Sequence, residues 1–208
     1  MANQINGFYP GKLYPNNTIA GCIDIFENIW PSPEETIRIV ENECSNPESY
    51  MHWEKAITWG KGLDQEHRTN DYISLATLAT YYNNVTAQNI HNQMNFLLLA
   101  TTIQYAKKHD ILELYHEPYD MLRYCNNQEY KCHYDGTTGT GRVISAILYL
   151  NDDYEGGEIE FVNFNLKIKP KPGMLILFPS NYAYAHIAHP VTSGKKYAIV
   201  TWIKDRPL

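Results

Sequence analysis

The sequence lacks the features that would place it in a membrane or on a nucleic acid. No run of about 18 apolar residues occurs, so no segment is long enough for a transmembrane helix. The first residues, MANQINGFYPGKLYP, are too polar for a signal peptide. Lys and Arg number 17 against 23 Asp and Glu, a net charge of -6 that argues against a nucleic-acid partner. We therefore expect a cytoplasmic protein with neither a membrane nor a nucleic-acid partner.

Cysteine is scarce, and its spacing carries no motif. The four residues Cys22, Cys44, Cys125 and Cys132 form no C-x-x-C pair, so we expect reduced thiols and no zinc site. Internal repeats, low-complexity segments and linkers are also missing from the 208 residues. Hydrophobic content of 44% and charged content of 19% exclude a disordered chain. One domain covering residues 1–208 is the expected organisation.

The first half of the chain carries helix signals. In WPSPEETIRIVENEC, Ser32 is the expected N-cap, Pro33 the first helical residue and Glu35 the partner in a capping box. From Thr86 to about His109, apolar residues recur every three or four positions, which predicts an amphipathic helix. The apolar positions of this helix are Ile90, Met94, Leu97, Leu98, Thr101 and Tyr105.

The second half consists of short β-favouring runs. They are YDMLRYC, VISAILYL, EIEFVNF, LKIKP, GMLILF and KYAIVTWI, and turn residues separate them. This pattern predicts a sandwich or jelly roll buttressed by the helices of the first half. The polar, glycine-containing segment from Trp59 to Tyr72 is expected to be a mobile loop that closes over a bound substrate.

The stretch KCHYDGTTGTGRVISAILYL places a histidine and an aspartate just before an apolar strand. Side chains two apart in an extended segment point to the same side, so His133 and Asp135 can bind one ion if a third ligand comes from another strand. The pair alone is a weak signal, because chance readily supplies an H-x-D. It becomes informative with the later segment HIAHPVTSGKKYAIVTW, in which a histidine precedes x-x-x-P-V-x-x-G-x-K and a β run ending in Trp.

Together these segments resemble the 2-oxoglutarate- and iron(II)-dependent dioxygenases, and within them the prolyl 4-hydroxylase-like group. LRY, HYDG, GRVISAILYLNDDYEGGEIEF and KPKPGMLILFPS extend the resemblance from about Tyr119 to Lys204. It implies an α+β, mainly β protein. A double-stranded β-helix (jelly roll) core at residues 113–208 would be buttressed by a helix-rich N-terminal support at residues 1–112. The sequence departs from the group where CNNQ replaces a Pro-Gly turn, although Asn also tolerates a left-handed turn.

The resemblance assigns the iron(II) ligands to His133, Asp135 and His186. Two imidazoles and a carboxylate on one face of an octahedron leave three positions for 2-oxoglutarate and O2. His189 is a rival for the third ligand. It stands three residues from His186 and directly before Pro190, whereas the pattern of the group places the ligand four residues before the proline.

Further site residues follow from the same resemblance. Lys196 matches the basic residue that pairs with the far carboxylate of 2-oxoglutarate, and Tyr124 matches a tyrosine whose hydroxyl shares that carboxylate. Trp202 matches an aromatic residue near the co-substrate, and Arg142 an arginine in contact with substrate. Tyr134 lies between two of the ligands and is a candidate for substrate packing. The alternatives are a solvated lysine at 196, core packing for both tyrosines, and a surface charge at 142.

The implied reaction is hydroxylation of a peptidyl proline at ring carbon four, which yields succinate and carbon dioxide from 2-oxoglutarate. Ascorbate would be an auxiliary reductant, and the partner would be a proline-containing peptide or protein. Two alternatives stay open. One is a 2-oxoglutarate oxygenase that acts on another residue or a small molecule, and the other is a non-catalytic metal-binding jelly roll. The intact triad together with Lys196 favours an enzyme.

Overall fold

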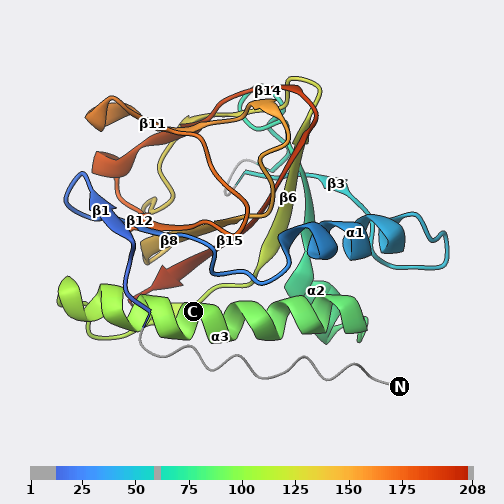
Figure 1. The fold of residues 1–208 in the computed structure, drawn as a ribbon, viewed down its shortest axis with the longest axis horizontal. Coiled ribbons are helices and arrows are strands. Elements are labelled where there is room, and N and C mark those ends of the chain that lie inside the picture. Colours follow the sequence, from blue (N-terminus) through green and yellow to red (C-terminus); the bar gives the residue numbers. More distant parts are fainter. Residues whose placement is uncertain (1–12, 59–61, 206–208) are drawn as a thin grey trace.

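A computed structural model describes residues 13–58 and 62–205. In this part of the chain, a large antiparallel sheet and a smaller one enclose a core, and the helices cover the outer face of the large sheet (Figure 1). This is the predicted jelly roll with helices on one side. None of the described helices has the length and apolarity that crossing a bilayer requires.

The large sheet has nine strands within the described residues, and β5 (Tyr115–His116) pairs with one of them, β15, off the main order. The order of the other eight is β1 (Asn17–Ile19), β2 (Ile23–Phe26), β12 (Leu175–Pro179), β8 (Arg142–Tyr149), β15 (Lys195–Lys204), β6 (Asp120–Cys125), β4 (Asp71–Ser74) and β3 (Glu54–Lys55).

The smaller sheet faces the inner side of the large one. Its order is β11 (Leu166–Ile168), β10 (Ile159–Phe161), β13 (His186–Ala188) and β7 (Tyr130–His133), and β14 (Val191–Ser193) pairs separately with β9 (Glu155–Gly156).

The predicted helices are present. They are α1 (Pro33–Cys44) and α3 (Val85–Lys108), and a short α2 (Leu75–Thr80) precedes α3. Ser32 is the N-cap of α1, but its side chain makes no capping hydrogen bond. The predicted capping box is therefore wrong, because Glu35 binds Arg38 instead.

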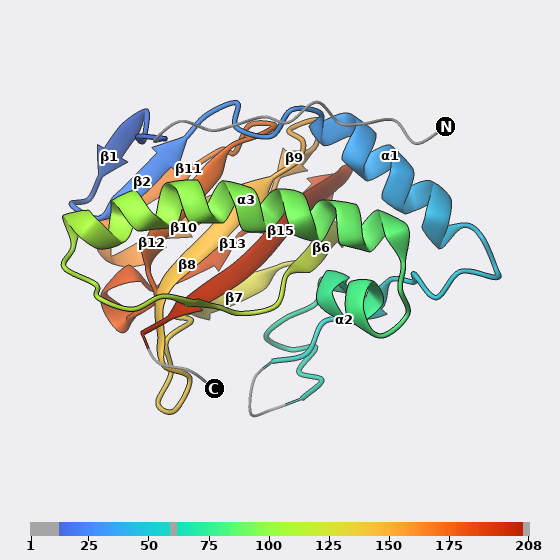
Figure 2. The ribbon, with the colours of Figure 1, turned by 90° about the horizontal axis from the view of Figure 1, so that it is seen from below.

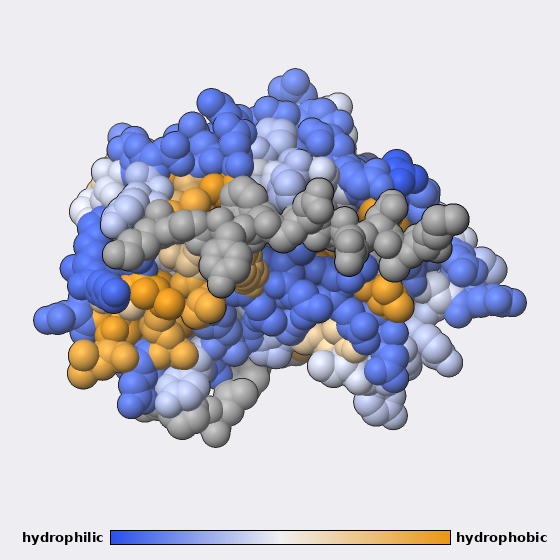
Figure 3. Space-filling view, turned by 60° about the horizontal axis from the view of Figure 1, so that its bottom comes forward, coloured by the Kyte–Doolittle hydropathy of each residue, from blue (hydrophilic) through white to orange (hydrophobic). Residues whose placement is uncertain are grey.

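Helix α3 lies across the large sheet (Figure 2). All six apolar positions predicted for it are buried. Apolar residues of α3 are not confined to this buried face, since Leu99 and Ile103 are exposed, and so is Leu112 in the segment after the helix. Figure 3 shows apolar side chains gathered on this side of the molecule.

Strands β8 and β15 have one face toward the helices and one toward the smaller sheet. Ile144 and Leu148 of β8 and Ile199 of β15 belong to the core cluster that also contains residues of α3. Tyr149 and Ala198 belong to the cluster between the sheets. Because side chains alternate along a strand, each of these strands serves the helix-facing core and the interior at the same time.

The description of residues 1–112 as a helix-rich support is incomplete, because this region also supplies strands to the large sheet. Strand β2 pairs with β12 and strand β4 pairs with β6. At four residues each, these strands are too short to show a clear alternation, and their pairing with distant partners stabilises them. A smaller correction concerns EIEFVNF, which leaves the sheet after Phe161 and forms a 3-10 turn at Val162–Phe164.

Two connections bear on the site. The predicted loop from Trp59 to Tyr72 lies partly outside the described residues, which resume at 62, and its last two residues begin β4. The turn that replaces Pro-Gly connects β6 to β7. Asn126 and Asn127 adopt φ values of 51° and 63° there, so the left-handed turn expected of Asn is formed.

Candidate metal centre

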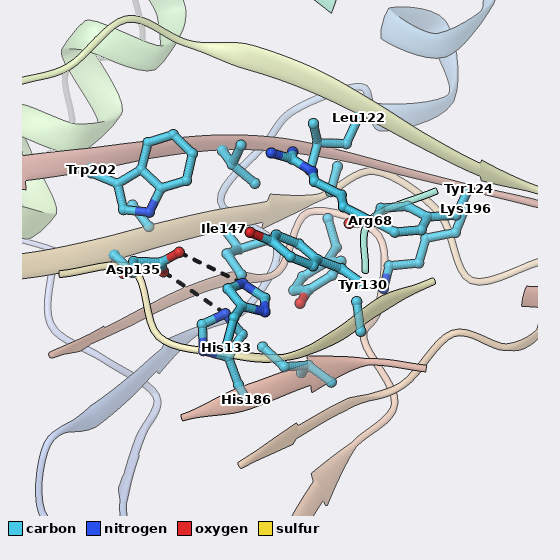
Figure 4. Close-up of a pocket in the computed structure, with 17 residues that line it drawn as sticks. Arg68, Leu122, Tyr124, Tyr130, His133, Asp135, Ile147, His186, Lys196 and Trp202 are labelled. Carbon is cyan, nitrogen blue, oxygen red and sulfur yellow. Dashed lines mark hydrogen bonds and ion pairs between the residues drawn. The ribbon is translucent and has the colours of Figure 1, made fainter. Parts of the chain in front are cut away.

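Three side chains meet at the edge of the smaller sheet. His133 ends β7 and pairs in register with His186, the first residue of β13, and Asp135 follows two residues after β7. Their ligand atoms all lie within 4.8 Å of one another. The Nε2 atoms of His133 and His186 lie 3.7 and 3.8 Å from the Asp135 oxygens, and Figure 4 shows the side chains converging.

Backbone carbonyls fix both imidazoles. The Nδ1–H of His133 donates to the carbonyl of Lys131 over 2.8 Å, and that of His186 donates to Tyr184 over 3.1 Å. Each Nε2 lone pair is therefore directed toward the carboxylate, in the tautomer that a metal ligand requires.

Asp135 is held as firmly as the imidazoles. The Ser145 hydroxyl donates to its Oδ2 over 2.6 Å, and the Trp202 indole N–H donates to the same carboxyl group. Burial raises the pKa of Asp135, but the two imidazoles and these hydrogen bonds outweigh burial and hold the pKa below its ordinary value. Burial, followed by the neighbouring His186, lowers the pKa of His133 to about 3. At neutral pH, an ionised carboxylate thus faces a neutral imidazole.

This donor set fits iron(II). Two imidazoles and one carboxylate form the facial set of non-haem iron(II) oxygenases, and it leaves ligand positions open for other molecules. The rival histidine lies elsewhere. His189 binds the Glu160 carboxylate through Nε2 over 2.5 Å, and its ring does not join the cluster.

A cavity of about 50 Å³, here called the inner cavity, extends from the triad into the space between the sheets. Figure 4 shows Asp135 and Lys196 on opposite sides of it. Alternate positions of three strands of the large sheet supply much of its lining, namely Leu122 and Tyr124 of β6, Ser145, Ile147 and Tyr149 of β8, and Lys196, Ala198, Val200 and Trp202 of β15.

Lys196 is the cationic side chain at the end of the inner cavity opposite Asp135. It is 2% exposed, and its ammonium donates to the carbonyl of Gly157 over 2.7 Å. The rings of Tyr124 and Tyr149 lie 4.9 and 5.4 Å from Nζ. Burial lowers the pKa of Lys196 to about 7. Within the described residues, no carboxylate lies within ion-pair distance of it, so an anionic ligand would supply the missing partner.

A second cavity of about 610 Å³, here called the outer cavity, lies on the other side of the triad. The two cavities share the residues that separate them, which are Arg68, Tyr130, His133, Asp135 and Trp202. The arrangement therefore offers a small, partly cationic space and a larger open space, with a metal centre between them.

Comparison with known proteins agrees with this geometry. A sequence model described as "2OG-Fe(II) oxygenase superfamily" matches residues 119–204. The human protein "Prolyl 3-hydroxylase 2" is 43% identical over a 74-residue alignment that covers 33% of this chain and 10% of that protein. The Arabidopsis thaliana protein "Prolyl 4-hydroxylase 13" is 32% identical over 121 residues, with 44% of each chain covered. Residues 119–204, which contain all three candidate metal ligands, are thus similar to the 2OG-Fe(II) oxygenase superfamily. The chain spans less than half the length of these curated relatives.

Solved structures support the fold of a 2OG-Fe(II) oxygenase. A prolyl hydroxylase from Trichoplax adhaerens, in complex with a hypoxia inducible factor peptide fragment, aligns with a TM-score of 0.71 at 18% identity. The alignment covers 89% of this chain and 84% of the Trichoplax adhaerens chain. The viral collagen prolyl hydroxylase of Paramecium Bursaria Chlorella virus-1 aligns with a TM-score of 0.61 at 23% identity and covers 89% and 97%. Oxygenases of this superfamily use Fe(II), 2-oxoglutarate and O2, and the donor set above fits that requirement.

Tyr124, whose hydroxyl was expected to share the far carboxylate of 2-oxoglutarate, lines the inner cavity, and burial raises the pKa of this hydroxyl to about 12. Trp202 has a second contact besides its hydrogen bond to Asp135. The Arg142 guanidinium lies 3.7 Å from the centre of the Trp202 ring. Trp202 therefore orients the Asp135 carboxylate by its N–H and makes a cation–π contact with Arg142 by its ring face.

Arg142 and Tyr134 both line the outer cavity, but Arg142 is paired with another side chain and Tyr134 is exposed. The Arg142 guanidinium donates to both carboxylate oxygens of Glu117, over 2.9 and 2.6 Å, so an internal partner already occupies one edge of its fork. It is thus neither a solvated surface charge nor a fully available donor. Tyr134 is 43% exposed, which excludes the core-packing alternative for this residue.

Two residues of this oxygenase site, Tyr130 and Arg68, were missed by reasoning from sequence. Tyr130 stacks on the His133 ring with 3.5 Å between ring centres, although residues three apart on a regular strand face opposite sides. A register shift between β7 and β13 changes this. His133 opposes His186 and Tyr130 opposes Ala188, so four residues of β7 oppose three residues of β13. No sequence signal marks the bulge, and Arg68 lies 65 residues before His133 outside any recognised motif.

Proposed function

We propose that this chain hydroxylates a prolyl residue of a peptide or protein at ring carbon four. The observation that carries the proposal is the His-Asp-His cluster set between a buried lysine and an open cavity. The prolyl hydroxylase names of the relatives and of the aligned structures favour proline over other targets.

Each part of the site has a role in this reaction. When bound, iron(II) and 2-oxoglutarate would supply the oxidising chemistry that adds one oxygen atom of O2 to a C–H bond and releases succinate and carbon dioxide. His133, Asp135 and His186 would hold the metal through Nε2, Oδ and Nε2. Lys196 would bind the far carboxylate of 2-oxoglutarate by its ammonium, and Tyr124 would lie against that carboxylate.

The outer cavity would receive the peptide. Its volume of about 610 Å³ and its aromatic lining by Tyr130, Tyr134 and Trp202 suit a proline ring within an extended segment. Its open side permits a chain to enter and leave, which a free amino acid does not require. Oxidation of another residue or of a small molecule is the second candidate, because the cavity by itself does not exclude either.

Carbon four is preferred to carbon three on the overall resemblance, although relatives of both kinds match this chain. We also propose a reducing compartment such as the cytoplasm, with ascorbate as reductant. The free state of all four cysteines supports that compartment.

Mass spectrometry of proline peptides after incubation with iron(II), 2-oxoglutarate and ascorbate tests the proposal. One added oxygen on proline is expected, with loss of the signal in His133→Ala. Chromatography against 3- and 4-hydroxyproline standards identifies the carbon. Oxygen on a different residue, or on free proline but never on peptides, would overturn the proline assignment and leave the metal centre intact.

A further inference from the structure

The outer cavity holds a cation that the site described above does not use. Arg68 lies between β3 and β4 and lines both cavities. Its guanidinium carbon lies 4.8 Å from the centre of the Tyr130 ring, and that ring stacks on His133. Figure 4 shows the side chain passing over Tyr130 toward the Trp202 side of the site. A charge in this position lies beside the path of any substrate that approaches the metal centre.

The guanidinium is incompletely paired. Its Nε–H donates to Asn70 Oδ1 over 2.9 Å, and an Nη1–H donates to the carbonyl of Ile57 over 2.8 Å. A guanidinium has five N–H donors, so three remain after these two bonds. In the described part of the chain, no carboxylate lies within ion-pair distance of Arg68. Two neutral acceptors therefore orient the fork and leave its charge unneutralised.

The neighbouring charges contrast with this arrangement. Arg142 and Lys204 share the Glu117 carboxylate, with contacts of 2.6 and 3.0 Å. Asp120 also lines the outer cavity. Its carboxyl accepts a hydrogen bond from Ser74 and is not within ion-pair distance of the Arg68 or the Arg142 guanidinium. The carboxylate of Asp135 lines the outer cavity as well. Three cations and three carboxylates therefore surround this wall, and Arg68 is the cation among them that has no carboxylate at ion-pair distance.

The separation from the metal centre limits where a complementary charge can lie. The step from Arg68 to the Tyr130 ring is 4.8 Å, and the step from there to the His133 ring is 3.5 Å. One extended residue covers ~3.3 Å, so these two steps correspond to about two residues of a substrate chain.

We propose that Arg68 is a specificity-determining residue that selects peptides with an acidic side chain within about two residues of the target proline. A carboxylate there can accept two parallel N–H bonds from the free edge of the guanidinium. This inference rests on the proposed function for its turnover readout, and its binding readout is independent of turnover.

The test uses three sets of proline peptides, which carry Glu, Gln or Lys. Each set places this residue, one peptide at a time, at each of the two positions before and the two positions after the proline. Affinity is measured anaerobically by fluorescence anisotropy with iron(II) and 2-oxoglutarate present, and kcat/KM is measured in air. The full chain should prefer at least one Glu peptide to its Gln counterpart by about tenfold, mainly in Kd and KM, and bind the Lys peptide most weakly.

Variants of the full chain assign the effect. Arg68→Gln should remove the preference, Arg68→Lys should keep part of it, and Asp120→Asn should enlarge it because a competing carboxylate is gone. Arg38→Gln is the matched control. This residue is an exposed arginine of α1 paired with Glu35, and its replacement should leave the preference unchanged.

Each outcome decides one of the two ideas. Equal Kd for Glu and Gln peptides in the parent chain, or a preference that survives Arg68→Gln, would overturn the role of Arg68. A Glu preference in binding with no oxygen added to any peptide would refute proline hydroxylation and leave the selectivity standing.

Discussion

Replacing Lys196 by methionine should make the co-substrate-free protein more stable and less able to bind 2-oxoglutarate. The ammonium is 2% exposed, and burial lowers its pKa from 10.5 to about 7. At about 1.4 kcal/mol per pKa unit, this corresponds to about 5 kcal/mol against the charged form. The carbonyl of Gly157 would lose its donor, which costs about 1–2 kcal/mol. The free energy of unfolding is therefore expected to rise by about 3 kcal/mol on this replacement, at pH values where Lys196 is charged in the folded parent chain.

The sign of the pH dependence follows from the lowered pKa. Below pH 7, the lysine is charged in both the folded and the unfolded chain, so the folded protein bears the full penalty. The penalty fades between pH 7 and 10.5, where the folded chain loses its proton first, and it is absent above both values. Lys196→Met should therefore raise the Tm by about 10 °C at pH 6 and by almost nothing at pH 9.5.

Thermal unfolding followed by circular dichroism at the two pH values measures this effect. Lys195→Met is the control, because this neighbouring lysine is exposed and faces away from the cavity. Added 2-oxoglutarate should raise the Tm of the parent chain and have little effect on Lys196→Met. If Lys196→Met lowers the Tm at both pH values, or matches Lys195→Met throughout, the reasoning from the buried charge is wrong.

Three further changes test other parts of the site. His186→Ala should abolish turnover and weaken iron(II) binding by at least tenfold, measured by metal titration, whereas His189→Ala should leave both nearly intact because its ring binds Glu160; the reverse result would exchange the two assignments. Tyr130→Leu should lower iron(II) affinity severalfold through loss of the stacked ring, with little change in Tm, and an unchanged metal titration would contradict a supporting role. Gly156→Ala should destabilise the fold by about 2–4 kcal/mol in urea unfolding, since a Cβ there would lie 2.2 Å from the Pro190 carbonyl oxygen at a φ of +73°; wild-type stability would show that the turn relaxes freely.

The sequence was sufficient for the features that depend on local pattern. The long helix α3 has its apolar spacing, the strands of the second half have their β-favouring runs, and Asn126–Asn127 has the residue type that a left-handed turn accepts. The three candidate ligands were proposed from motif order, and the fold brings them together.

Other features depend on contacts between distant segments, which no local pattern encodes. Arg142 binds Glu117, 25 residues earlier in the chain, and this contact changes the role expected of it. Arg68 reaches the site through the tertiary placement of the segment before β4. The short strands β1 to β4 form because partners elsewhere complete their hydrogen bonds, and their own composition is a poor guide.

The alternation along β15 ties the chemistry of this protein to its folding. Lys196 and Trp202 occupy positions of the same parity on this strand, while Tyr197 and Ile199 occupy the other parity and pack beneath the helices. A slip of one residue would move the lysine and the indole under the helices and push the two apolar residues into the cavity. A chain with a misaligned site would therefore also lose its core, so quality control that removes unfolded protein would remove most inactive molecules of this kind as well.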